Sequence, residues 1–434
     1  MPTTVKRLGA LAGYTAWPVP RNNKWIHLGD SRVSIDTENT GTEVTNRATS
    51  YGSAAWCQHT SNYRGRYVGN YGVNANTLDQ MITRLTSVET RGQVLSNDAG
   101  VCAVTGGVNN TTEVIGTVGP KYDTLIKTLV DSGFVVLWEN ELPNTDQSTQ
   151  GAANLGRRDY IDNAYYPGYM DRIIKVPTYD ALAAAPRSYF FRDGLRTPPD
   201  LLHPNLAGNR IRGQLRGVIL DQLYAAAGYG PRAKLATKVG PGAPMFVGNT
   251  GGLGGATGFM SDGWSPDPPP AGLTVVYSKA TDPDGYDQQV VTVTGTAGSL
   301  GSTQQWNIPN NGLGGAWAQS GDTVQHACRV IVDSGNVGLC GLGVGQNVQN
   351  STLSLFQNQV MFGGTVYNSY SLDGGAWGGA PFDGVVMSQP ATLDAGWTAA
   401  ASKSIQPILY MSALGGVAVN FTIRFSRSTL QLNA

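Results

Sequence analysis

The stretch KYDTLIKTLVDSGFVVLW, residues 121–138, decides the fold class of this chain. Leu125 and Leu129 recur at helical spacing, which predicts a helix over residues 121–132. Gly133 is a typical residue after the end of a helix. The run Phe134–Trp138 is short and apolar throughout, as in a strand buried on both faces. A helix followed at once by such a strand indicates a parallel sheet flanked by helices.

Residues 1–242 repeat this alternation on both sides of the stretch. We expect the first sheet strand at Trp25–Leu28, a helix over Thr77–Arg91 and a long closing helix over Leu206–Ala227. The first domain is therefore predicted to have an α/β three-layer fold with a parallel sheet at its centre.

The rest of the chain has a different texture. Residues 243–271 are rich in Gly and Pro, and we expect a linker or the first turns of a second domain there. Over residues 272–434 the helical pattern is absent, and strands alternate apolar and polar positions, as Val417–Phe425 does. This part is predicted to be a jelly-roll-like β-sandwich that binds carbohydrate or assembles the protein.

Composition excludes several classes of function. The 434 residues carry 30 basic and 30 acidic side chains, so no excess charge calls for nucleic acid or an anionic membrane. No apolar run is long enough to span a bilayer. The four cysteines form no metal-binding pattern and are expected to be buried free thiols, although Cys328 and Cys340 could pair across a hairpin. We expect no metal and no cofactor. Low charge and abundant Gly favour a location outside the cell or on a virion.

Residues suited to ester chemistry stand at predicted strand ends and loops. Ser31 follows the first strand, at the sheet edge where α/β proteins place their sites. Asp200 and His203 stand three residues apart before the closing helix, so that the carboxylate could orient the imidazole as a base for a serine. Gly72 and Asn109 end strand-like runs and offer the N–H and amide donors that an oxyanion hole requires.

Four short blocks in this order resemble the conserved blocks of the SGNH, or GDSL-type, hydrolases. The blocks are Gly29-Asp30-Ser31, Asn70-Tyr71-Gly72, Gly107-Val108-Asn109-Asn110 and Asp200-Leu201-Leu202-His203-Pro204-Asn205. The resemblance covers roughly residues 22–228 and implies a flavodoxin-like fold. It implies Ser31 as nucleophile, His203 as general base and Asp200 as its orienting partner. It also implies an oxyanion hole formed by the Ser31 and Gly72 N–H groups and the Asn109 side chain.

Three residues depart from the family pattern. Arg32 replaces the usual Leu after the nucleophile, a change from which we expect no consequence. Ala75 stands where a second glycine is frequent, which could change the loop. Asn110 replaces a frequent Asp and removes a charge near the site. None of the three is expected to take part in the reaction.

The resemblance predicts a serine esterase that removes O-acetyl groups from a carbohydrate such as a bacterial surface polysaccharide. The second half is similar to the β domains of phage tail-spike or virion-associated deacetylases and of some secreted esterases. The expected partner is the glycan alone, with no nucleic acid and no membrane insertion, and a virion-associated protein would be a homotrimer. Alternatives are a lipase, lysophospholipase or thioesterase on the same machinery, and a glycan-binding adhesin or tail-fibre component without turnover.

Two features of the second half have competing interpretations. The tryptophans beyond residue 243 could stack on sugars, but core positions are expected for most of them: Trp264, Trp306, Trp317, Trp377 and Trp397. The acidic stretch at residues 281–287 could bind calcium, although a Pro-Asp-Gly turn explains it more simply.

Overall fold

The computed structural model describes most of the chain: residues 17–34, 47–48, 53–87, 94–111, 113–144, 149–188, 190–192, 195, 202–204, 206–232, 235, 245–299, 303–310, 313–350, 354–355, 359–363, 381–400 and 402–432. By its contacts the chain divides into two compact units. The α/β unit comprises residues 1–44, 56–204 and 208–231, and the β unit comprises residues 45–55, 205–207 and 232–434.

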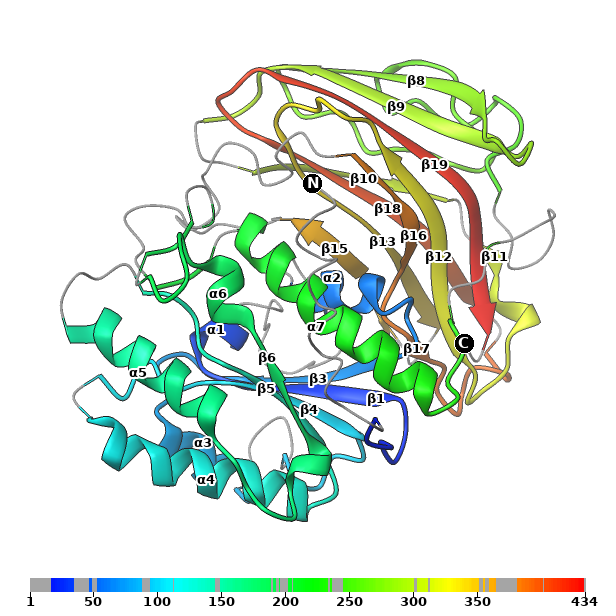
Figure 1. Cartoon of the computed structure of the whole chain (residues 1–434). Coiled ribbons are helices and arrows are strands. Elements are labelled where there is room, and N and C mark those ends of the chain that lie inside the picture. The colour runs from blue at the N-terminus through cyan, green and yellow to red at the C-terminus, as the bar shows by residue number, and fades with distance from the viewer. Residues whose placement is uncertain are drawn as a thin grey trace. The chain divides into compact units, whose positions relative to one another are not determined.

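A five-stranded parallel sheet forms the centre of the α/β unit, with the strand order β3-β1-β4-β5-β6 (Figure 1). The strands are β1 Lys24–Gly29, β3 Arg66–Gly72, β4 Val101–Thr105, β5 Val135–Glu139 and β6 Ile173–Val176. When these five strands are numbered 1 to 5 along the chain, their order across the sheet is 2-1-3-4-5, which is that of flavodoxin-like doubly wound folds. The predicted three-layer α/β fold is therefore confirmed.

Helices cover both faces of this sheet. They are α1 Ser31–Ser34, α2 Ser53–Thr60, α3 Leu78–Arg84, α4 Ile115–Asp131, α5 Thr149–Asn163, α6 Thr178–Leu182 and α7 Leu206–Ala226. Figure 1 shows α3, α4 and α5 on one face. Ile26 and Leu28 belong to the buried core cluster on that face. His27 lies between them in β1 and points the other way, toward Arg216 of α7.

The helix bounds differ from the predicted ones in two places. Helix α4 begins at Ile115 rather than Lys121, because it continues through Pro120, which removes one backbone donor. Helix α3 ends at Arg84, earlier than expected, and residues 88–93 lie outside the described residues. Helix α7 and strand β5 lie within one residue of their predicted positions.

The β unit is a sandwich of two sheets, each with seven strands among the described residues. The strands are β2 Arg47–Ala48, β7 Thr257–Gly258, β8 Leu273–Thr281, β9 Asp287–Gly295, β10 Thr303–Pro309, β11 Leu313–Gly314, β12 Thr323–Val332, β13 Leu339–Asn350, β14 Ser354–Leu355, β15 Gln359–Gly363, β16 Phe382–Met387, β17 Ala391–Thr392, β18 Lys403–Leu414 and β19 Val419–Leu432. Val324 and Leu430 of one sheet share a buried cluster with Val348 and Ile405 of the other.

The strand order identifies this sandwich as a jelly roll. One sheet contains the run β9-β19-β12-β16, and the other contains β10-β18-β13-β15. Each strand of the first run is therefore matched in the second by its neighbour in the sequence, so the chain changes sheet between β9 and β10, β12 and β13, β15 and β16, and β18 and β19. This double Greek-key winding defines the jelly roll, as the sequence predicts.

Several open questions about the β unit have answers in the structure. Trp264, Trp306 and Trp397 are buried, so they are core residues, whereas Trp377 lies outside the described residues. Residues 245–271 pack within this unit, as the hydrogen bond from the Ser265 N–H to the Pro309 carbonyl shows.

The cysteines and the acidic stretch are also settled by local contacts. All four cysteines are free and buried, and Cys328 and Cys340 lie on β12 and β13, which belong to different sheets rather than to one hairpin. In the stretch 281–287, Asp282 Oδ1 accepts the Asp284 and Tyr286 N–H groups and so closes a turn between β8 and β9.

Candidate active site

The carboxyl edge of the parallel sheet carries the candidate site. Strand β1 ends at Gly29, which pairs with Gly72 of β3 on one side and Thr105 of β4 on the other. A Cβ atom on Gly29 would lie 2.3 Å from the Thr105 carbonyl oxygen, so only glycine allows this close approach. The chain then leaves the sheet through Asp30, and Ser31 is the first residue of α1. Ser31 thus lies where open α/β sheets place their sites.

His203 lies beside Ser31 although 172 residues separate them in the sequence. Its Nε2 is 2.8 Å from the Ser31 Oγ, and both side chains are half-buried. With the proton of the imidazole on Nδ1, the serine hydroxyl donates to Nε2, which is the arrangement of a nucleophile next to its base. Asp200 lies outside the described residues, so its role as the orienting carboxylate stays a prediction.

Helix α1 is a single turn, too short to be stable alone, and side chains from distant elements hold it. Asn70 at the end of β3 donates from Nδ2 to the Val33 carbonyl at 2.8 Å. Arg212 of α7 donates to the Arg32 carbonyl at 2.7 Å. Arg212 belongs to the helix that follows His203, so a direct hydrogen bond links the segments that carry the serine and the histidine.

Of the three predicted oxyanion donors, the Ser31 N–H makes no hydrogen bond within the described residues. The Gly72 N–H instead donates to Asn70 Oδ1 at 2.8 Å, so an oxyanion would have to displace that oxygen. A Cβ atom on Gly72 would lie 2.1 Å from the Ser34 nitrogen. Glycine is therefore required here on steric grounds, because it allows β3 to approach α1 closely.

Ala75 is a residue whose importance the sequence reasoning missed. It lies in the left-handed region with φ 60°, and within the described part of the chain its N–H has no hydrogen-bond partner. The next residue, Asn76, accepts a bond of 3.0 Å at its carbonyl from Asn109 Nδ2, which leaves the second amide hydrogen of Asn109 available. The signal was present in the sequence, because Ala75 occupies a position where the hydrolases that the four blocks resemble frequently have glycine.

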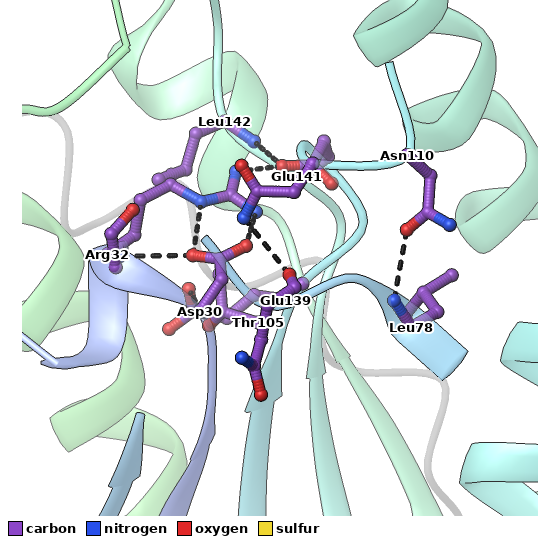
Figure 2. Close-up of polar contacts among 12 residues, drawn as sticks. Asp30, Arg32, Leu78, Thr105, Asn110, Glu139, Glu141 and Leu142 are labelled. Carbon is purple, nitrogen blue, oxygen red and sulfur yellow. Dashed lines mark hydrogen bonds and ion pairs between the residues drawn. The ribbon is translucent and has the colours of Figure 1, made fainter. Parts of the chain in front are cut away.

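Asn110 has a structural role beside this loop. Its Oδ1 accepts the Leu78 N–H at the start of α3 at 3.0 Å (Figure 2). Its Nδ2 donates to Glu113 at 2.8 Å. Its carbonyl accepts a bond of 2.5 Å from Arg157 of α5. An amide can donate and accept at once, whereas an ionised Asp only accepts, so the departure from Asp serves this junction.

Arg32 corrects our expectation that its departure from Leu has no consequence. Its fully buried guanidinium lies between Asp30 and Glu141 (Figure 2) and forms an ion pair with each carboxylate, that with Asp30 at 2.7 Å. Burial acts to lower the pKa of Arg32, but the two carboxylates outweigh it and raise this pKa above the usual value. Removing one partner of such a buried cluster typically costs about 3–5 kcal/mol. Arg32 therefore connects α1, the single turn that begins at Ser31 and is called the serine turn below, to the loop after β5.

Glu139 is the centre of a second buried cluster, on the α7 face of the sheet. Its carboxylate forms ion pairs with Arg212 at 2.8 Å and with Arg216 at 2.7 Å. Burial acts to raise the pKa of Glu139, yet the two arginines hold it well below the ordinary value. Thr105 donates to the same carboxylate at 2.7 Å and contacts the buried His27. Together these bonds join β1, β4, β5 and α7 directly beneath the site.

Comparisons with known proteins find distant structural likenesses only. The sequence matches no known protein family and no curated protein. Among solved structures it is similar to a lipolytic protein of the G-D-S-L family from Veillonella parvula, with 17% identity, 44% of this chain and 94% of that chain covered, and a TM-score of 0.33. It is also similar to a variant of an acetyl-xylooligosaccharide esterase from Geobacillus Stearmophilus, with 14% identity, 46% and 96% covered, and a TM-score of 0.36. It is similar as well to a solved structure described as one of carbohydrate-binding modules from the β-sandwich superfamily, with 13% identity, 43% of this chain and 63% of that chain covered, and a TM-score of 0.25. These scores are low, and the fold assignment rests on the strand orders.

The described residues lack two further features. None of the helices in that part of the chain combines the length and the apolar character needed to cross a bilayer. The same residues contain no group of three or more histidine, cysteine or acidic side chains arranged to hold a metal ion.

Proposed function

We propose that this protein is an SGNH-type serine esterase that removes O-acetyl groups from a polysaccharide. One observation supports the proposal most strongly: the Ser31 Oγ lies 2.8 Å from His203 Nε2 at the carboxyl edge of a flavodoxin-like sheet. Chance rarely brings a serine hydroxyl and an imidazole nitrogen together at the edge where this fold places its active sites.

The reaction follows the usual chemistry of acyl transfer. Ser31 Oγ attacks the ester carbonyl while His203 accepts its proton, and the carbonyl oxygen becomes an oxyanion. His203 then gives the proton to the departing sugar oxygen, which releases the alcohol and leaves Ser31 acylated. A water molecule, deprotonated by His203, attacks the acyl-enzyme; the bond between Ser31 Oγ and the acyl carbon then breaks, His203 returns the proton to Ser31 Oγ, and acetate is released. Asp200 would hold the imidazole with its proton on Nδ1.

The oxyanion needs hydrogen-bond donors that are not already occupied. The Ser31 N–H, the second amide hydrogen of Asn109 and the Ala75 N–H meet this condition among the described residues. We therefore propose Ala75 as the backbone donor in place of Gly72, whose N–H is bound to Asn70. Removing one such donor typically lowers kcat by about a hundredfold to a thousandfold.

The first experiment measures acetate release from p-nitrophenyl acetate. Ser31→Ala should abolish Ser31-dependent turnover, and Ser34→Ala is the matched control because it removes a hydroxyl from the same one-turn helix. Unchanged activity in Ser31→Ala would refute the mechanism. Substrate class is tested with p-nitrophenyl esters of increasing chain length and with acetylated xylan, xanthan and gellan.

The outcomes separate the candidate functions. Acetate release from a polymer, with a preference for C2 esters, supports the deacetylase. A maximum at C8 or longer points to a lipase, lysophospholipase or thioesterase. Glycan binding without any ester cleavage would make the protein an adhesin or tail-fibre component. We also propose that the protein acts outside the cell or on a virion. If it is virion-associated, we expect a homotrimer, and light scattering of the purified protein would measure its mass.

A further inference from the structure

A groove runs along the outer surface of α4 and α5 in the α/β unit. It consists of two adjoining cavities of about 700 and 620 Å³, both lined by Ile115 and Gly156. Its polar lining includes Asp123 and Lys127 of α4. From Ile115 to Lys127 the lining extends along α4 for about 18 Å, at the rise of an α-helix. This α4–α5 groove is long enough for a short oligosaccharide and much longer than an acetyl group.

Within the described residues of the α/β unit, most of the exposed large apolar or aromatic side chains line the α4–α5 groove. Among the described residues of the α/β unit, Val114, Ile115 and Tyr165 are exposed to 71%, 41% and 71% and line it, whereas outside it the exposed large apolar or aromatic side chains are Val19 and Phe190. Contiguous exposed apolar surface next to polar groups commonly marks a binding site.

The floor of the groove is kept low by a glycine inside a helix. Gly156 lies in α5, and a Cβ atom there would have no other atom within 4 Å. No packing constraint therefore requires glycine at this position, although glycine in a helix interior is unfavourable relative to alanine. What the glycine provides is open space in the groove, which both cavities share.

The tyrosines at one end of the groove are held rigidly. Tyr160 and Tyr166 both donate to the Asp123 carboxylate, at 2.5 and 2.7 Å. Tyr166 also stacks on Trp138 of β5, and Tyr160 on Tyr122 of α4. Burial, together with Asp123, raises the pKa of Tyr160 to about 12, so its phenol remains a donor at neutral pH. These two fixed rings line the groove together with Tyr165, which is the exposed tyrosine among them.

The other end of the groove is lined by Thr111 and Glu113, which follow Asn109 closely in the chain. Arg157 lines it there and donates to the Asn110 carbonyl, one residue after the proposed oxyanion donor Asn109. A polymer whose ester reached Ser31 could therefore continue along α4 and α5. Aromatic faces for sugar C–H groups, beside carboxylates and an ammonium for hydroxyls, suit a glycan better than an acyl chain, which needs an apolar enclosure.

We propose that the α4–α5 groove is a glycan-binding subsite, which holds the polysaccharide chain away from the ester under attack. The inference rests on the proposed function for its substrate class. It assigns Tyr165 as the stacking platform and Gly156 as the residue that keeps the groove open. The groove contributes to binding of the polymer and not to the chemistry at Ser31.

The decisive variant is Gly156→Leu, which fills the groove without removing any contact. Because a Cβ atom at this position meets no atom outside its own stretch of helix within 4 Å, and leucine favours helix, the melting temperature should not fall. We expect KM for the acetylated polymer to rise at least fivefold, with kcat/KM for p-nitrophenyl acetate within twofold of the wild type. Tyr165→Ala should act in the same way, Tyr165→Phe should retain binding, and Phe190→Ala, outside the groove, is the control.

Binding is measured separately from turnover by affinity electrophoresis in chemically deacetylated polymer, with the Ser31→Ala protein. Unchanged polymer KM and unchanged retention in Gly156→Leu would overturn the inference. So would a selective loss of C8 ester hydrolysis, which would assign the groove to an acyl chain. If no polymer in the panel is bound or deacetylated, the subsite and the polysaccharide substrate both fail, whereas Ser31-dependent p-nitrophenyl acetate hydrolysis would leave the esterase standing.

Discussion

Replacing Arg212 with lysine should impair catalysis more than it impairs folding. The guanidinium makes three bonds in different directions, to Glu139 at 2.8 Å, to the Arg32 carbonyl at 2.7 Å and to the Thr105 hydroxyl at 2.8 Å. A lysine ammonium can keep the charge pair with Glu139, but it lacks the planar fork that reaches the other two. We expect the bond to the Arg32 carbonyl, which links α7 to the serine turn, to be lost.

The size of the effect follows from that single bond. A hydrogen bond from a charged donor contributes about 1.5–3 kcal/mol. If it serves to hold Ser31 and His203 in register during the reaction, its loss lowers kcat by roughly 10- to 100-fold. KM should change little, because Arg212 is buried and does not reach substrate. Arg212 is in this sense a positioning residue.

Arg216 supplies a matched control in the same helix. It is also fully buried and also pairs with Glu139, but it contacts His27 and Trp25 of β1, whereas Arg212 donates to the Arg32 carbonyl of α1. Arg216→Lys should therefore lose comparable stability and keep kcat within about threefold. The assays are kcat and KM on p-nitrophenyl acetate, the labelling rate of Ser31 by a fluorophosphonate, and thermal unfolding. Equal losses of kcat and of labelling in the two variants would refute the positioning role.

Three other predictions follow from buried or strained residues. Arg32→Leu should cost about 3–5 kcal/mol in urea unfolding, because it leaves two buried carboxylates without a cation; adding Glu141→Gln should recover part of that loss, and no recovery would contradict the cluster. Ala75→Gly should stabilise the protein by about 0.5–1 kcal/mol and keep activity, since glycine adopts positive φ freely and retains the N–H; a lower melting temperature would argue against the left-handed conformation. Burial lowers the pKa of His326 to about 4, below the ordinary 6.5, so the unfolded chain takes up the proton first as the pH falls. The contribution of His326 to the free energy of unfolding should be complete above pH 6.5 and decline by roughly 3 kcal/mol toward pH 4. In His326→Gln this part of the pH dependence of the unfolding free energy should be absent, as measured for both proteins across that range.

The parts of the fold that were predictable are those with local signals. Strand β5 and helix α4 follow from hydrophobic spacing, and the alternation near Phe421 indicates a β-sandwich. Jelly-roll winding was a correct expectation, but the pairing of β19 with β12 and β9 is set by contacts far apart in the chain. Bounds were missed where sequence signals conflict, as at Pro120.

The candidate site divides in the same way. Ser31 and His203 stand in recognisable blocks, and the structure brings the Ser31 Oγ to 2.8 Å from His203 Nε2. The charged cluster beneath them was not predictable, because Glu139 closes an otherwise apolar strand and its partner Arg212 lies 73 residues later on a different element. Spacing patterns identify residues that share a helix or strand face, but not partners that meet only after the sheet has assembled.

The single-turn helix that carries Ser31 has a consequence for folding. Its carbonyls are bound by a strand-end asparagine and by an arginine from the closing helix, so the turn has no stable form until those distant elements have docked. Reactivity of Ser31 should then arise late during refolding, in step with α7 rather than with β1, and disappear when α7 detaches even if the sheet persists. The rate at which Ser31 becomes reactive toward a serine-directed probe would therefore report when α7 docks, the last step of assembly.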